Sequence, residues 1–404
     1  MFWSNPVLSM PPIRLLELRN TYKWGGGPDK TILLSAARHD PSRVSAIVAY
    51  VRDARDREFN IADQARALGL TFYEIEERSK FDVGVLRTIR DIIIHHDINL
   101  IHSHDYKSNL FAYLVRWFLR HRHVCLLSTA HGWALLSARG EIYRRLDQFL
   151  LRRFDHVLTV SHATKHELVS AGISPASISV LHNAIDPEAW SPLEEQSVLR
   201  EDMISEPRFP VVGYVGRITP EKDLHTWLYS AALVVQQFPH SNFMLVGDGK
   251  DKTLLNDLQR LAGTLGIAEQ VTFHGYQQIL RPFYAKFDLF LLTSVTEGLS
   301  NSLLEAMAMA LPTVVTRVGG NEELVIDGHT GYILPPGDVQ GIAQAIITLA
   351  QNKQLRRDMG RASRKRIERE FSFDHRIQHI ESLYEHLMGV QPKGASSPYA
   401  TLPS

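Results

Sequence analysis

The fold is decided by the stretch FDLFLLTSVTEGLSNSLLEAMAMA, residues 287–310. Its apolar start, 287–292, predicts a buried strand, and the end of the stretch is rich in good helix formers. Glu297 and Gly298 lie where the strand would turn into the helix. At the carboxyl end of a parallel strand, such a turn exposes backbone amides that bind anionic ligands. We therefore expect a ligand site here, with Glu297 at its mouth. Glu305, about one turn into the helix, could bind two vicinal hydroxyls of a ribose.

A second interpretation of the same residues needs no ligand. Ser302 and Glu305 have the spacing of a helix capping box, and acidic residues are favoured in a first helical turn. A short motif alone does not decide between the two interpretations.

The rest of the chain has the pattern of two α/β domains. Short β-branched runs alternate with helical stretches, which predicts parallel sheets with crossover helices. A proline-rich and acidic segment without a strand pattern divides the alternation into two series. We predict a first domain at 1–186, a linker at 187–209 and a second domain at 210–372. The Pro-, Ser- and Gly-rich end, 391–404, is expected to be disordered.

The composition limits the class of protein and its partners. With 404 residues, 44% hydrophobic and 22% charged, the chain is typical of a soluble globular protein with two cores. Its formal net charge of zero provides no overall field toward nucleic acid. The single cysteine, Cys125, excludes an internal disulfide and fits a reducing compartment. Neither a secretory signal pattern nor a membrane-spanning apolar run is visible, so we expect a cytoplasmic protein.

Two glycine-containing strand ends in the second domain add candidate phosphate ligands. Gly216 and Arg217 follow an apolar run, and Lys222 precedes the next helical stretch. Glycine permits close backbone approach, Arg offers a fork of donors and Lys is a point charge, so these residues could bind a diphosphate, although taken alone they favour an ordinary solvated turn. Gly247 and Asp248 end the next strand, and the alternative for Asp248 is a helix cap.

These blocks, in this order, resemble the retaining glycosyltransferases of family four. The resemblance spans residues 211–388 and rests on the Glu-x7-Glu of EGLSNSLLE, on GYVGRITPEKDL at 213–224 and on VGDG at 246–249. It implies the GT-B fold, in which two Rossmann-like domains face each other across a cleft. A last helix, within 373–390, would cross back to the first domain.

The resemblance also implies the residues of the site. Glu297, Arg217, Lys222 and His131 would act in catalysis. The donor would be bound by Gly216, Gly247, Asp248, Gly298, Leu299, Ser300, Asn301 and Glu305, together with Gly26 and Gly27 from a glycine run that resembles the family's flexible loop. His104 and Asp105 would line the acceptor cleft. The segment from His102 to Asp105 also has residue types that bind zinc, but the fold normally uses no metal and we expect none.

The implied activity is transfer of a sugar, with retention, from a UDP- or GDP-sugar to a hydroxyl of a glycan or a lipid-linked acceptor. Such a reaction would belong to bacterial cell-surface polysaccharide or glycolipid synthesis and would need no cofactor. The alternatives are a nucleotide-sugar epimerase of the same fold and a non-catalytic sugar-nucleotide-binding protein.

A basic and aromatic segment, 107–153, bears on the acceptor. It carries nine Lys and Arg against two acidic residues, with aromatic residues such as Trp117 and Phe118 interleaved. A buried helix with a solvated tip explains most of these residues. The alternative is a patch that holds the protein at an anionic membrane surface, facing a lipid-linked acceptor.

Overall fold

The computed structural model describes residues 13–390, apart from 24, 80–81, 133–137, 193–209 and 250–251. The predicted tail at 391–404 and most of the predicted linker lie outside the described residues.

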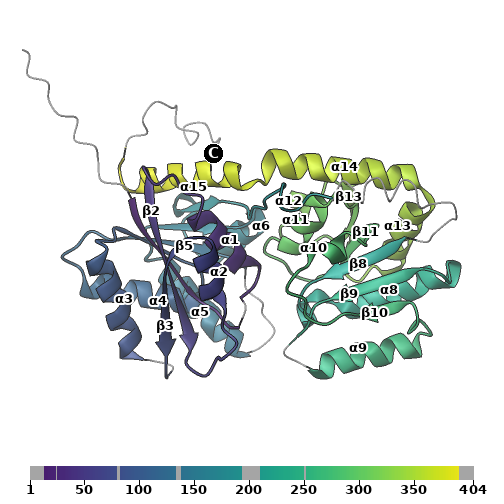
Figure 1. Ribbon diagram of the computed structural model, residues 1–404, viewed down its shortest axis with the longest axis horizontal. Helices are drawn as coiled ribbons and strands as arrows, with labels where there is room; N and C mark the ends of the chain where they lie inside the picture. Colours follow the sequence, from purple (N-terminus) through teal and green to yellow (C-terminus); the bar gives the residue numbers. More distant parts are fainter. Residues whose placement is uncertain are drawn as a thin grey trace, which may run out of the picture.

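The first domain is built on a parallel sheet of seven strands in the order β3-β2-β1-β4-β5-β6-β7 (Figure 1). The strands are β1 (Ile13–Asn20), β2 (Val44–Asp53), β3 (Thr71–Glu77), β4 (Leu100–Ser103), β5 (Cys125–Ala130), β6 (His156–Thr159) and β7 (Ile178–Val180). The helices that connect them are α1 (Gly27–Ala36), α2 (Ile61–Ala67), α3 (Val83–His95), α4 (Tyr106–Phe118), α5 (Ala138–Leu151) and α6 (His162–Ser170).

The second domain repeats this plan with six parallel strands in the order β10-β9-β8-β11-β12-β13. The strands are β8 (Val211–Val215), β9 (Asn242–Val246), β10 (Val271–Phe273), β11 (Leu289–Leu292), β12 (Thr313–Thr316) and β13 (Gly331–Leu334). The helices are α8 (Leu224–Gln237), α9 (Lys252–Thr264), α10 (Arg281–Tyr284), α11 (Asn301–Ala308), α12 (Asn321–Leu324), α13 (Val339–Gln351) and α14 (Lys353–Glu370).

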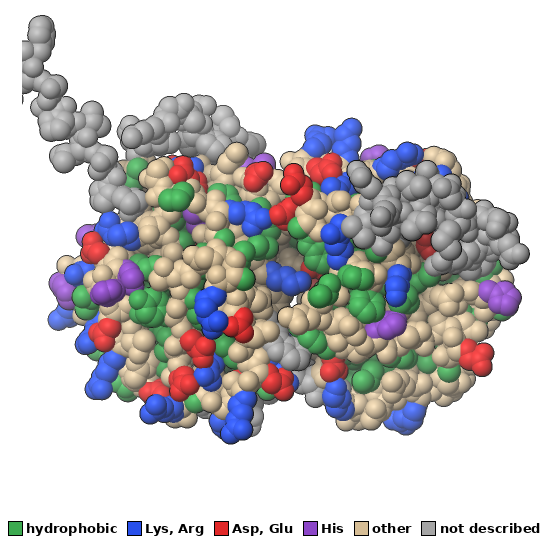
Figure 2. Space-filling model, viewed as in Figure 1, with side chains coloured by type: hydrophobic (Ala, Val, Ile, Leu, Met, Phe, Trp, Pro, Cys, Tyr) green, Lys and Arg blue, Asp and Glu red, His purple; other side chains and the backbone are tan. Residues whose placement is uncertain are grey.

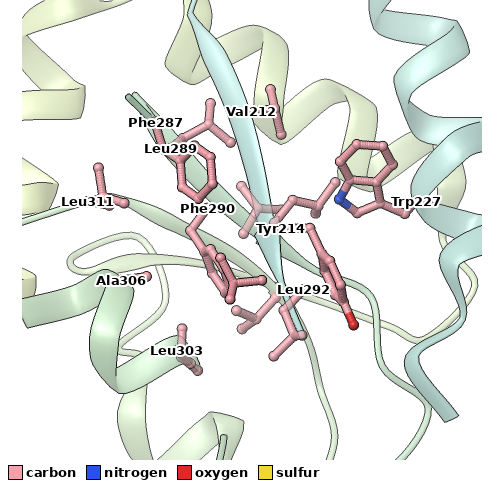
Figure 3. Packing of buried hydrophobic residues seen from close by; sticks show 14 of the residues in the cluster. Val212, Tyr214, Trp227, Phe287, Leu289, Phe290, Leu292, Leu303, Ala306 and Leu311 are labelled. Carbon is pink, nitrogen blue, oxygen red and sulfur yellow. The ribbon is translucent and has the colours of Figure 1, made fainter. Parts of the chain in front are cut away.

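The central strands of the second domain are apolar because helices cover both faces of the sheet. All residues of β8 and β11 are buried. In Figure 3, Trp227 of α8 lies on one side of these strands, and Leu303 and Ala306 of α11 lie on the other. Gly213 in β8 has no room for a side chain, since a Cβ atom there would lie 2.2 Å from the Phe287 ring.

The last helix, α15 (Phe373–Leu387), returns to the first domain, as predicted. Figure 1 shows α14 and α15 running one after the other along both domains. Ile380 and Tyr384 of α15 pack into a cluster with Leu15 and Leu100 of the first sheet. The two sheets and this return confirm the predicted fold class. None of the helices in the described part of the chain is long and apolar enough to cross a membrane.

Candidate functional site

Each sheet reverses its strand order once, between β1 and β4 in the first domain and between β8 and β11 in the second. In open α/β sheets, ligands bind beyond the carboxyl ends of the strands at such a switch point. In the second domain, these strand ends lead into the segments that contain Gly216 and Glu297. Figure 2 shows this face of the molecule as two lobes that meet at a groove.

Glu305 lies in α11, where side chains of both domains bind its carboxylate. The Tyr284 hydroxyl donates to Oε2 at 2.9 Å, and the ammonium of Lys30, from the first domain, donates to Oε1 at 3.1 Å. The capping-box interpretation is wrong, because α11 begins at Asn301 and the hydroxyl of Ser300 accepts from the amide of Leu303. Ser302 lies one residue inside the helix, which leaves Glu305 beyond the range of a cap.

Glu297 and Lys222 form a mostly buried ion pair at the turn before α11. The Lys222 ammonium lies 2.6 Å from Oε1 of Glu297, and the Ser294 hydroxyl donates to the same oxygen at 2.7 Å. The backbone of Glu297 is closely covered, since a Cβ atom on Gly319 would lie 1.8 Å from the Glu297 carbonyl oxygen. The structure therefore brings these two predicted residues together and fixes the lysine at the turn that leads into α11.

Bare backbone forms the neighbouring edge of the site. A Cβ atom on Gly247 would lie 1.8 Å from the carbonyl oxygen of Gly216, so the ends of β8 and β9 touch without side chains between them. The Arg217 side chain is 74% exposed, and its guanidinium lies 3.4 Å from Glu221. Asp248 accepts from the amide of Gly249 and from the ammonium of Lys252. Among these groups, Arg217 is the cation that is most open to a ligand.

His131 forms the facing wall in the first domain. A Cβ atom on Gly298 would lie 2.2 Å from the His131 carbonyl oxygen, so the two domains touch here. Both ring nitrogens of His131 are buried without a partner among the described residues. Burial, and next the charge of Arg19, hold the pKa of His131 well below its ordinary value. A neutral imidazole can donate through one nitrogen and accept through the other, and buried polar groups normally have such partners.

The predicted glycine loop becomes helical from Gly27 onward. The amide of Gly26 donates to Asp29 at 2.6 Å, and Asp29 is paired with the buried guanidinium of Arg19. A Cβ atom on Gly27 would lie 2.0 Å from Nδ2 of Asn301, so α1 and α11 meet at their N-termini. The absence of side chains on the glycines permits this approach.

The predicted acceptor residues have well-defined structural partners. Asp105 is the N-cap of α4 and accepts from the amides of Lys107, Ser108 and Asn20. His104 is buried, and its Nε2 lies 2.5 Å from Glu17. Burial lowers the pKa of His104 to about 3, so the neutral ring donates to the carboxylate of Glu17.

Glu17, His102 and His104 are the one group in the described part of the chain whose ligand atoms lie within 4.8 Å of one another and could hold a metal ion. His102 is already hydrogen-bonded to the hydroxyls of Tyr384 and Thr129, at 2.8 and 2.7 Å. Together with the bond from His104 to Glu17, these contacts account for the cluster as a network of hydrogen bonds.

Two residues that contact Glu305, Lys30 and Tyr284, were not identified by the sequence analysis. Lys30 lies three residues after the glycine run, but no local pattern shows that it faces Glu305.

Comparison with known proteins identifies relatives of both domains. Residues 33–189 match the family model described as Glycosyltransferase Family 4, and residues 209–352 match the one described as Glycosyl transferases group 1. The chain is 26% identical to N-acetyl-alpha-D-glucosaminyl L-malate synthase of Bacillus anthracis over 77% of this chain and 81% of that protein. It is 25% identical to the Escherichia coli UDP-Gal:alpha-D-GlcNAc-diphosphoundecaprenol alpha-1,3-galactosyltransferase, over 75% of this chain and 79% of that protein.

A solved structure shows the same fold. Anabaena HepE in complex with UDP-glucose superposes with a TM-score of 0.79 at 22% identity, over 92% of this chain and 99% of that one.

Proposed function

The chain belongs to the group 1 glycosyltransferases of family 4, and from this premise we propose that it uses a nucleotide diphosphate sugar and retains the anomeric configuration. One observation carries the proposal: at the switch point of the second sheet, Glu297, Lys222 and the N-terminus of α11 converge, with Glu305 one turn away. HepE was solved with UDP-glucose and the E. coli relative is named for UDP-Gal, which supports a UDP-sugar ahead of a GDP-sugar.

The donor would lie along this edge with its ribose at Glu305. The carboxylate would accept from two ribose hydroxyls, while Tyr284 holds one of its oxygens. Arg217, Lys222 and the first amides of α11 would bind the diphosphate through charge and helix dipole. The bare backbone at Gly216 and Gly247 would allow the nucleotide to approach closely.

Transfer would then depend on stabilising the leaving group. The acceptor hydroxyl attacks the anomeric carbon on the face from which the diphosphate departs. A carbon–oxygen bond forms, the bond to the phosphate oxygen breaks, and the leaving phosphate takes the proton. Lys222 and Arg217 stabilise the charge that grows on the diphosphate. The unpartnered nitrogens of His131 would bind a hydroxyl of the transferred sugar.

The acceptor would enter along the first domain. His104 keeps one ring nitrogen, Nδ1, buried without a partner among the described residues, and we propose it as an acceptor-side contact. Both carboxylate oxygens of Asp105 are engaged in capping α4 and binding β1, which makes a direct contact with the acceptor less favourable.

Donor binding and product release test this proposal. UDP-sugars are expected to raise the melting temperature more than GDP-sugars do. Release of UDP is expected to increase strongly when an extract containing glycan or lipid-linked acceptors is added. An epimerase would convert the sugar without releasing UDP, and a binding protein would do neither. We propose a reaction without a metal ion, so full activity is expected in excess chelator.

Helices α4 and α5 of the first domain carry a surface suited to an anionic membrane. Trp117 and Phe118, in the last turn of α4, are each 58% exposed, and Ile142 and Phe149 of the neighbouring α5 are also exposed. Burial of the helix therefore does not explain these aromatic residues. Arginines surround them, including Arg153, which lies over the Phe149 ring at 3.5 Å. We propose that this surface rests on anionic lipid and brings the site to a lipid-linked acceptor.

Replacing Trp117 and Phe118 with serine is expected to release the protein from anionic vesicles. The wild-type protein should co-sediment at low salt and detach at high salt, because each arginine near the surface contributes about 1 kcal/mol of salt-sensitive attraction. Tyr229→Ser, which removes an exposed aromatic residue from α8 of the second domain, should bind as the wild type does. If the wild type fails to co-sediment even at low ionic strength, the surface serves another purpose.

A further inference from the structure

A lysine of the first domain forms an ion pair with the carboxylate at which we place the donor ribose. Lys30 lies in the first turn of α1, and its ammonium is 3.1 Å from Oε1 of Glu305 in α11. The Lys30 side chain is 48% exposed, whereas that of Glu305 is 7% exposed. A flexible cation therefore covers a nearly buried anion of the other domain.

The surroundings leave Glu305 little freedom while this pair exists. Its other oxygen accepts from Tyr284, whose buried hydroxyl shares its one hydrogen with the carbonyl of Ser302. The Lys30 ammonium also lies 5.8 Å from the centre of the Trp190 ring. Two ribose hydroxyls could bind the carboxylate only by displacing the Lys30 ammonium. Both carboxylate oxygens are already engaged, and little of the Glu305 side chain reaches solvent.

We propose that Lys30 is a latch between the domains that competes with the donor ribose for Glu305. In the empty enzyme the ammonium neutralises the carboxylate and ties α1 to α11, where Gly27 already touches Asn301. Donor binding displaces the ammonium, and product release restores the pair. This inference rests on the proposed ribose site and adds that donor binding and the contact between domains are coupled through one lysine.

Two measurements, the reactivity of the Lys30 amine and the affinity for UDP, distinguish a lysine that competes with the donor from one that binds the donor or only stabilises the fold. If Lys30 competes, UDP frees its amine, and removing the amine tightens UDP binding. If Lys30 instead bound the donor directly, UDP would protect the amine, and removing it would weaken binding. If the pair were only structural, its loss would lower the melting temperature and leave the affinity for UDP unchanged.

The first experiment measures labelling of Lys30 by an amine-reactive reagent, followed by mass spectrometry of the full-length protein. Saturating UDP is expected to raise the labelling rate of Lys30 about two- to tenfold, the effect of releasing a partly exposed ion pair. Glu305→Gln should raise it similarly without any nucleotide. Lys107, which pairs with Glu77 inside the first domain, serves as the internal reference.

The second experiment compares the Kd for UDP of Lys30→Met, Lys30→Arg and the wild type by calorimetry. Lys30→Met is expected to bind UDP about two- to tenfold more tightly, and Lys30→Arg to bind as the wild type does. Arg90→Met, which removes the same charge from the pair with Asp91 on α3, should change nothing.

Equal or weaker UDP binding by Lys30→Met overturns the latch and leaves the donor site standing. If no variant binds UDP or GDP, the proposed donor site fails, and the labelling of Lys30 in Glu305→Gln still decides whether the two domains are latched. Unchanged labelling in that variant overturns the latch by itself.

Discussion

Replacing Lys222 with alanine is expected to lower kcat by about 100- to 1,000-fold, the cost of losing one preorganised donor at a developing charge. The backbone around Lys222 is held independently of its side chain, because the hydroxyl of Thr293 donates to the Lys222 carbonyl at 3.1 Å. The segment should therefore keep its place when the ammonium is removed. Arg217→Ala is expected to lose activity in the same range. Steady-state kinetics with the UDP-sugar found by the donor screen measures both effects.

A loss of stability must be separated from a loss of catalysis in this test. Lys222→Ala leaves the mostly buried carboxylate of Glu297 without its cation, and an unpaired buried charge is destabilising. The double variant Lys222→Met with Glu297→Gln removes both charges, so it should recover much of the melting temperature but none of the activity. Lys252→Ala, which removes an exposed cation paired with Asp248, should retain most of the activity. Losses below threefold in both Lys222→Ala and Arg217→Ala would exclude the two residues from diphosphate binding.

The positions of the strand ends could be predicted because their patterns are local. The apolar runs that form β8 and β11 end at glycine-containing turns, and the helix formers after Gly298 form α11. Two strands that the sequence does not mark clearly, β7 and β13, have three and four residues and lie at the edges of their sheets. Such short edge strands carry too few residues for a clear alternation.

Contacts between distant segments could not be predicted in the same way. Glu17 pairs with His102 across β1 and β4, and this register gives His104 its carboxylate partner. The pair of Lys30 with Glu305 depends on how the two domains are placed. The pattern of apolar residues in either segment does not indicate how the two domains lie relative to each other. The exposure of Trp117 likewise depends on what covers the last turn of α4, which the sequence of the helix does not specify.

The capping-box alternative failed for a local reason. Ser300 and Ser302 are both good capping residues two positions apart, and the hydroxyl of Ser300 reaches the amide of Leu303. A shift of two residues in the start of the helix changes the role of Glu305. It turns a residue that could satisfy the helix end into one whose carboxylate binds Tyr284 and Lys30 instead.

Glu305→Gln is expected to weaken donor binding by about 1–3 kcal/mol, the range for a hydrogen bond to a charged group. The amide keeps the size of the side chain and can still accept from Tyr284, so the fold around α11 should be retained. The Kd for the donor should rise about 5- to 150-fold, with a smaller change in kcat because the ribose is remote from the reacting carbon. Calorimetry with UDP measures the change in affinity.

The size of this effect depends on the pair that Glu305 forms with Lys30. The variant no longer attracts the Lys30 ammonium, so part of the lost affinity is offset because no latch has to be displaced. Lys30→Met combined with Glu305→Gln should therefore bind UDP no more tightly than Glu305→Gln alone. Glu323→Gln, which removes the charge paired with His182 elsewhere between the domains, is the matched control and should leave the Kd unchanged. If Glu305→Gln lowers the melting temperature while the affinity for UDP stays the same, the carboxylate only joins the two domains, and the ribose must bind elsewhere along the edge of the sheet.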